Sequence, residues 1–180
     1  IVFYNNNDQV IHTQNASVLD LKDMASHYEF SNDKLIGNST RRNAKIIPRP
    51  FDFNYGIEAS LMDLHHALTS LIFPSSVDAS HRWDITESDR NFLIKCLGMY
   101  PRELNIKEYD DPAAFPDHLL KYIVLGDTKN GGNTNKLRTF SKIGLAYGFF
   151  SETAYVVDFE KNIDFFLSIS IYINANQTVN

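Results

Sequence analysis

The sequence predicts an α+β fold, with helices packed on an antiparallel sheet. Two apolar stripes at helical spacing occupy the middle of the chain, and alternating runs rich in β-branched and aromatic residues occupy its end. Because those runs follow one another with short spacers and no intervening helix, we expect antiparallel pairing. The 180 residues, 43% of them apolar, are enough for one domain with a substantial core.

Residues 1–56 are expected to form a strand-rich extension. An Asn-Asn-Asn-Asp cluster at residues 5–8 separates two alternating runs, which predicts a hairpin. Pro48 and Pro50 close the extension, because proline cannot donate to a strand ladder. The segments that predict strands are Ile1 to Tyr4, Gln9 to Thr13, Leu35-Ile36 and Lys45-Ile46-Ile47.

Residues 57–180 begin with a predicted helix. Ser60 stands at the N-cap position, and Asp63 follows three residues later, the spacing of a capping box. Pro74 ends the helix, since proline cannot continue it. The residues that share one apolar face are Leu61, Leu64, Leu68, Leu71 and Ile72.

A second helix is predicted after Thr86, with Asp89 completing another capping box. It stops between Gly98 and Pro101. Its apolar stripe consists of Phe92, Leu93, Cys96 and Leu97, so we expect Cys96 to be a small buried hydrophobe.

Two segments separate this helix from the sheet. Leu119 to Leu125 is a short apolar run that fits either a helix or a strand. Thr128 to Asn135, which contains Gly131-Gly132 and several asparagines, predicts a flexible loop.

The last third predicts a three-stranded antiparallel meander. Its two spacers are the polar pair Ser151-Glu152 and the triplet Glu160-Lys161-Asn162. The expected strands are Leu137 to Phe150, Ala154 to Phe159 and Asp164 to Asn174.

Composition excludes two classes of partner. The formal charge is −5 with no dominant basic block, which argues against nucleic acid as a partner. No run approaches the eighteen or so consecutive apolar residues of a membrane span, so we expect no membrane span in this chain.

The segment from Arg138 to Phe149 contains Lys142-Ile143-Gly144 and resembles the Lys-Thr-Gly strand of serine β-lactamases and penicillin-binding proteins. The two runs that follow it stand where that family places its next sheet strands. The likeness extends upstream through Tyr100-Pro101-Arg102-Glu103 to about Asn54. The resemblance implies a β-lactamase or transpeptidase-like fold, of which residues 57–180 would be the C-terminal portion.

This resemblance implies acyl transfer without a cofactor, in a periplasmic or other extracytoplasmic location. The substrate would be a small molecule or of peptidoglycan type. Lys142 would attract a substrate carboxylate and help to steer protons, and Gly144 would let the substrate approach the backbone. Ile143 replaces the family's hydroxyl residue, which removes one hydrogen bond to that carboxylate.

The resemblance places the nucleophilic serine in an upstream N-terminal part of the same protein, so that these 180 residues would be a fragment or a processed product, inactive alone. Ser31 and Lys34 spell Ser-x-x-Lys, but Asn32 and Asp33 favour a turn and no apolar helical stripe follows.

Three other constellations are weak. Asn38-Ser39-Thr40 has the wrong order for the family's Ser-x-Asn loop, and Glu103-Leu104-Asn105 is too short for its Glu-x-x-Leu-Asn loop. His65 and His66 are adjacent on a helix and point about a hundred degrees apart, which does not suit joint metal ligation.

Two functions therefore stay open. The first is the C-terminal part of a β-lactamase-like serine hydrolase, in which Lys142 and Gly144 are the site residues. The second is a non-catalytic binding or scaffold domain of the bacterial envelope, which Ile143 and the missing nucleophile favour.

Overall fold

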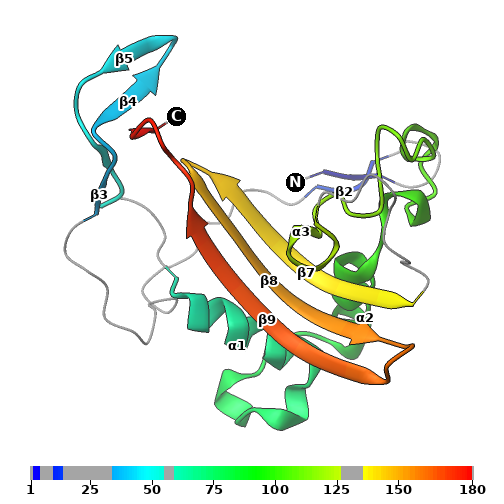
Figure 1. Cartoon of the computed structure of the whole chain (residues 1–180). Coiled ribbons are helices and arrows are strands. Elements are labelled where there is room, and N and C mark those ends of the chain that lie inside the picture. The colour runs from blue at the N-terminus through cyan, green and yellow to red at the C-terminus, as the bar shows by residue number, and fades with distance from the viewer. Residues whose placement is uncertain (1, 5–9, 14–33, 55–58, 127–135, 180) are drawn as a thin grey trace.

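The main body of the protein is a three-stranded antiparallel sheet, seen in a computed structural model that describes residues 2–4, 10–13, 34–54, 59–126 and 136–179 (Figure 1). Its strands lie in the order β7-β8-β9. They are β7 (Leu137–Ala146), β8 (Phe149–Asp158) and β9 (Ile163–Tyr172). The α+β class and the terminal meander are confirmed.

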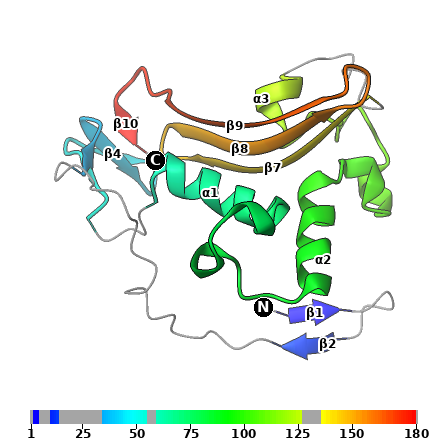
Figure 2. The same ribbon diagram turned by 90° about the horizontal axis from the view of Figure 1, so that it is seen from below.

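Helices lie on both faces of this sheet (Figure 2). Helices α1 (Leu61–Ile72) and α2 (Glu87–Gly98) cover one face, and the single-turn α3 (Tyr122–Leu125) lies over part of the other. The His65 ring nitrogen Nδ1 lies 2.9 Å from the Ser168 hydroxyl and ties α1 to β9. The backbone N–H of Ile123 in α3 donates to the Glu152 carboxylate of β8 at 2.8 Å.

Both long helices begin where their capping residues predict. The Ser60 hydroxyl accepts from the Asp63 N–H at 3.0 Å, and the Asp63 carboxylate accepts from the Ser60 N–H at 2.7 Å. Thr86 and Asp89 form the same reciprocal pair at the start of α2. Such caps satisfy N–H groups that have no partner within the helix.

The turn between the first two strands was predicted in the wrong place. Ser151-Glu152 was expected to be a spacer, but both residues lie inside β8. The chain turns instead at Tyr147-Gly148, where φ is 55° and 84°. A two-residue hairpin loop with both φ values positive matches the right-handed twist of its strands, and glycine tolerates that backbone without strain.

The described part of the extension contains short strands, and the predicted hairpin β1–β2 and the strands β3 and β5 are confirmed. Strands β4 and β6 were missed, because two-residue and arginine-rich strands carry little apolar pattern. The strands of the extension are β1 (Val2–Tyr4), β2 (Val10–Thr13), β3 (Leu35–Ile36), β4 (Ser39–Arg42), β5 (Lys45–Ile47) and β6 (Phe51–Asp52).

The C-terminal end of the chain joins this extension. Strand β10 (Thr178–Val179) pairs parallel with β4, so residues 178–179 and 39–40 lie side by side (Figure 1). Val179 is fully buried.

Apart from α2, the described segments between α1 and β7 are mostly irregular. The open choice for Leu119 to Leu125 resolves as a turn followed by α3, whereas Thr128 to Asn135 lies outside the described residues. The remaining short elements are 3-10 turns at Pro74–Ser76, Ala79–His81, Pro101–Glu103 and Lys107–Tyr109. None of the helices that the structure describes is long and apolar enough to cross a membrane.

Helix α2 contributes less to the core than predicted. Cys96 is exposed, and Phe92 is 65% exposed, so the expectation of a buried Cys96 was wrong. The helix meets the sheet at its C-terminal end, where Gly98 lies against the Phe140 ring of β7. Buried apolar residues among those described are Leu68, Leu71, Tyr100, Leu125, Ala154, Val156 and Val179.

Candidate functional site: the open edge of β7

Strand β7 is an edge strand, and in the described part of the chain only β8 pairs with it. The Phe159 N–H donates to the Lys136 carbonyl at 2.8 Å, so even-numbered residues of β7 bond to β8 through their main chain. Alternation then turns the main-chain N–H and C=O groups of Ile143 and Leu145 away from β8. These groups form the open edge of β7.

Lys142 and Gly144 lie on this strand beside a cavity of about 560 Å³. Both are exposed, and their register partners Thr153 and Ser151 on β8 line the same cavity. Its volume falls in the range of small-ligand sites. The structure therefore brings the two sequence-predicted site residues together at one cavity.

The opposite wall of the cavity is apolar and helical. It consists of Leu64, Leu68 and Leu71 from α1 and of Leu93 and Leu97 from α2. The α1 leucines recur at i, i+4 and i+7, which places them in one row along the helix. Trp83 lies beside them and holds its place by donating its indole N–H to the Ala67 carbonyl at 2.9 Å.

On the sheet side of the cavity, the Lys142 amine has a hydrogen-bond partner and the Thr153 hydroxyl has none among the described residues. The Lys142 amine donates to the neighbouring Ile143 carbonyl at 2.5 Å, so it lies at the open edge. The Thr153 hydroxyl is buried and has no hydrogen-bond partner among the described residues. A buried hydroxyl without a partner costs about 1–3 kcal/mol.

Gly144 has no side chain and so leaves space on the sheet side of the cavity. A Cβ at this position would lie 2.8 Å from the Ser151 hydroxyl, which is closer than real Cβ atoms approach. Any side chain here would displace Ser151 and fill space beside Lys142.

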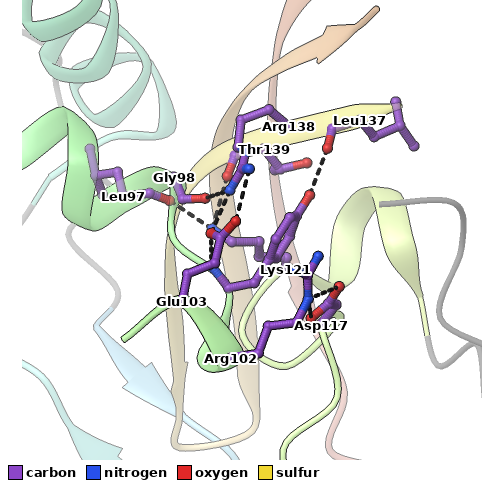
Figure 3. A network of polar contacts seen from close by, with 10 residues as sticks. Leu97, Gly98, Arg102, Glu103, Asp117, Lys121, Leu137, Arg138 and Thr139 are labelled. Atoms are coloured by element: carbon purple, nitrogen blue, oxygen red, sulfur yellow. Dashed lines mark hydrogen bonds and ion pairs between the residues drawn. The ribbon is translucent and has the colours of Figure 1, made fainter. Parts of the chain in front are cut away.

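A network of polar contacts surrounds the first residues of β7 (Figure 3). Arg138 donates to both oxygens of Glu103, at 2.6 and 3.0 Å, and to the Gly98 carbonyl at 2.9 Å. Hydrogen bonding from Arg138 lowers the pKa of Glu103. The guanidinium also stacks over the Tyr100 ring, 4.7 Å from its centroid. This network fixes the end of α2 against the start of β7.

Lys121 is the most deeply buried cation of this region. Its amine donates to the carbonyls of Leu97, at 2.6 Å, and Thr139, at 2.8 Å, and the residue is 4% exposed. Burial lowers the pKa of Lys121 to about 8. Glu152 is buried nearby, and burial raises the pKa of its carboxyl.

The weaker sequence candidates take structural roles or lie outside the described residues. Ser39 bonds Thr178, with 2.7 Å between their hydroxyl oxygens, and Glu103 pairs with Arg138. Ser31 lies outside the described residues, so its pairing with Lys34 is not seen. No group of three metal-ligating side chains occurs among the residues that the structure describes.

Sequence reasoning missed Lys121 and Thr153. Lys121 stands between an irregular segment and a one-turn helix, and Thr153 sits in an alternating strand like any other residue. Their burial depends on residues distant in sequence, so no local pattern marks either of them.

No protein-family model, curated protein or solved structure matches this chain.

Proposed function

We propose that the chain is the C-terminal part of a β-lactamase-like serine hydrolase that transfers acyl groups. One observation carries the proposal. Lys142, Ile143 of the open edge and Gly144 all line the same cavity.

The geometry of that edge supports the proposed roles. The outward N–H groups of Ile143 and Leu145 are available to polarise a substrate carbonyl, and such preorganised donors supply a large share of acyl-transfer catalysis. The Lys142 amine would leave the Ile143 carbonyl to pair with a substrate carboxylate. Gly144 would allow the scissile group to approach the strand.

The nucleophile would come from an upstream part of the same protein. A serine hydroxyl gives its proton to its own base and attacks the substrate carbonyl carbon; the leaving group departs with that proton and leaves an acyl-enzyme. Water, deprotonated by the same base, then attacks the acyl carbon, and the serine oxygen leaves with that proton as the carboxylic acid product is released.

The proposed substrate is a β-lactam, a cell-wall peptide or a small ester or amide, met outside the cytoplasm. Ile143 offers no hydroxyl, so a carboxylate on the substrate would be bound mainly by Lys142.

The alternative is a non-catalytic binding or scaffold domain of the bacterial envelope. The contact of Lys142 with its own strand and the apolar side chain of Ile143 favour it. In that case the cavity would bind an apolar partner without chemistry.

Two observations test the proposal. Residues 1–180 alone should neither hydrolyse a chromogenic β-lactam nor form a stable adduct with labelled penicillin, and stoichiometric labelling of Ser31 or any other serine of this chain would contradict it. The upstream reading frame should encode Ser-x-x-Lys at the start of an apolar helix. Its absence would favour the binding domain.

A further inference from the structure

The β4–β5 hairpin of the extension is strongly basic. From Lys34 to Phe51 the sequence contains five basic residues and no acidic one, although the whole chain has a formal net charge of −5. Four of the five are exposed, and they form what we call the basic patch: Arg41, Arg42, Lys45 and Arg49. Their side chains form no hydrogen bond or ion pair with other residues that the structure describes. The patch is therefore available to an anionic partner.

Cross-strand pairing keeps these cations together. Arg42 lies directly opposite Lys45, and Arg41 lies opposite Ile46. The chain turns between the strands at Asn43-Ala44, where φ is 46° and 63°, the backbone of a two-residue hairpin loop. Like charges directly opposite one another destabilise a strand pair. The pairing of Arg42 with Lys45 thus weakens the hairpin that carries it.

The rest of the extension holds the patch in place. The Thr40 hydroxyl donates to the Arg49 carbonyl at 3.0 Å, which brings Arg49 back beside β4. Strand β10 pairs with the other edge of β4, and its Val179 is fully buried. The basic patch is therefore part of a folded strand assembly, held at both edges of β4.

An apolar side chain stands among these charges. Ile46 is 59% exposed and shares a face of the hairpin with Arg41. Cations next to exposed apolar side chains suit the surface of an anionic bilayer, where the cations attract lipid phosphates and the apolar group enters the boundary of the acyl chains. A nucleic acid also offers phosphates, but it has no apolar layer for Ile46. The composition of the hairpin therefore favours a lipid surface.

The position of the hairpin fits an approach in which it meets such a surface first. It lies to one side of the main sheet in both views of the molecule, beside β10 (Figures 1 and 2). Because the chain is acidic in spite of the patch, an anionic surface would repel the rest of it. Only the hairpin has the charge that such a surface attracts.

We propose that the basic patch and Ile46 bind the surface of a bilayer that contains anionic phospholipids, with the lipid phosphate groups as ligands. None of these residues lines the cavity beside β7, and the inference does not depend on the proposed function. Each basic residue of the patch strengthens binding about fivefold.

Sedimentation of the whole chain with lipid vesicles tests the proposal. The chain should bind vesicles made of equal parts of phosphatidylglycerol and phosphatidylcholine, and should bind phosphatidylcholine alone roughly tenfold more weakly or less. Added salt should weaken the binding, because the charges of the patch are exposed. Equal binding to the two kinds of vesicle, or binding to neither, would overturn the proposal.

Matched charge substitutions show whether the patch is responsible. Lys45→Gln removes one charge and relieves the repulsion from Arg42, so it should weaken vesicle binding about fivefold without lowering the melting temperature. Lys107→Gln removes the same charge from an exposed site outside the extension and should leave the binding unchanged. Equal weakening by the two substitutions would refute the patch as the binding site.

A third variant separates a bilayer from other polyanions. Ile46→Ser removes only the apolar contact, so it should weaken vesicle binding and leave its salt dependence unchanged. Unchanged vesicle binding in Ile46→Ser would overturn the assignment to a bilayer. Binding of duplex DNA that is as strong as vesicle binding, and equally sensitive to Lys45→Gln, would overturn it as well.

Discussion

Lys142 and Lys121 carry the same amine in opposite surroundings. Lys142 is exposed at the open edge, whereas Lys121 is buried with two carbonyl partners. An exposed lysine contributes about 0–1 kcal/mol to stability, so its value lies in what it can bind. A buried lysine instead determines how the surrounding backbone packs.

The buried amine predicts a specific dependence of stability on pH. Because the pKa of Lys121 falls from 10.5 to about 8 on folding, the unfolded chain binds the proton more tightly between these values. The free energy of unfolding should therefore rise with pH from about 8 to 10.5. Urea unfolding of the chain and of Lys121→Met checks this, since other titrating groups cancel in the difference. A difference that stays constant over this range would contradict the burial of a charged Lys121.

At the scale of elements, the junction of α2 with β7 depends on close approach. A Cβ on Gly98 would lie 2.7 Å from the Phe140 ring. Arg138, which donates to the Gly98 carbonyl, reinforces the same junction.

Gly98→Ala tests this junction because two effects oppose one another. In a helix interior alanine is about 0.5–1 kcal/mol more favourable than glycine, which is an upper bound for Gly98 as the last residue of α2. Overpacking against Phe140 should outweigh that and cost about 1–3 kcal/mol. Thermal and urea unfolding should show net destabilisation, and Phe140→Leu in the same chain should recover part of it. Ser88→Ala, exposed on the same helix, is the control and should change stability by less than about 0.5 kcal/mol. A stabilising Gly98→Ala would refute the close contact.

The elements that could be predicted are those with local causes. Both capping boxes lie within four consecutive residues, so Ser60 and Thr86 located their helices correctly. The turn after β7 was misplaced because Glu152 is polar yet buried, through a bond from Ile123 that sequence does not reveal. Tyr147 likewise does not resemble a left-handed turn residue.

At the scale of the molecule, the C-terminal end of the described chain returns to strand β4 of the extension. The Gln177 carbonyl accepts from the N–H groups of Asn38 and Ser39, at 2.7 and 3.1 Å. The predicted division at residue 56 separates strands β3 to β6 from the main sheet in sequence, but β10 returns to pair with β4. A hydrophobic pattern cannot foresee such a short parallel pairing.

Removal of residues 177–180 should therefore release the extension selectively. The loss of Val179 and of the Gln177 carbonyl should speed amide exchange in β4 and β5. Exchange in β8 should stay slow, because its strand partners remain. Thr178→Ala, which removes only the hydroxyl bond to Ser39, should have a smaller effect. Equal loss of protection in β4 and β8 would show that the two regions unfold as one unit.

The site was predictable only in part, because local sequence patterns do not show which distant elements come together. Lys142-Ile143-Gly144 is contiguous and could be singled out from sequence, whereas the cavity needs α1, α2 and β8 to converge. Thr153 lines that cavity, and Lys121 joins α2 to β7 through the carbonyls of Leu97 and Thr139.

Acylation of the protein encoded by the complete reading frame tests the central claim most directly. The rate of adduct formation with labelled penicillin or an activated ester should be followed by intact mass spectrometry for the unsubstituted protein, Lys142→Ala and the exposed control Lys161→Ala. We predict that Lys142→Ala slows acylation at least tenfold, because an oriented charge can contribute several kcal/mol to a transition state. Its melting temperature should match that of the control. An unchanged acylation rate in Lys142→Ala, or loss of folding in place of activity, would contradict the assignment of the open edge of β7 as the substrate site.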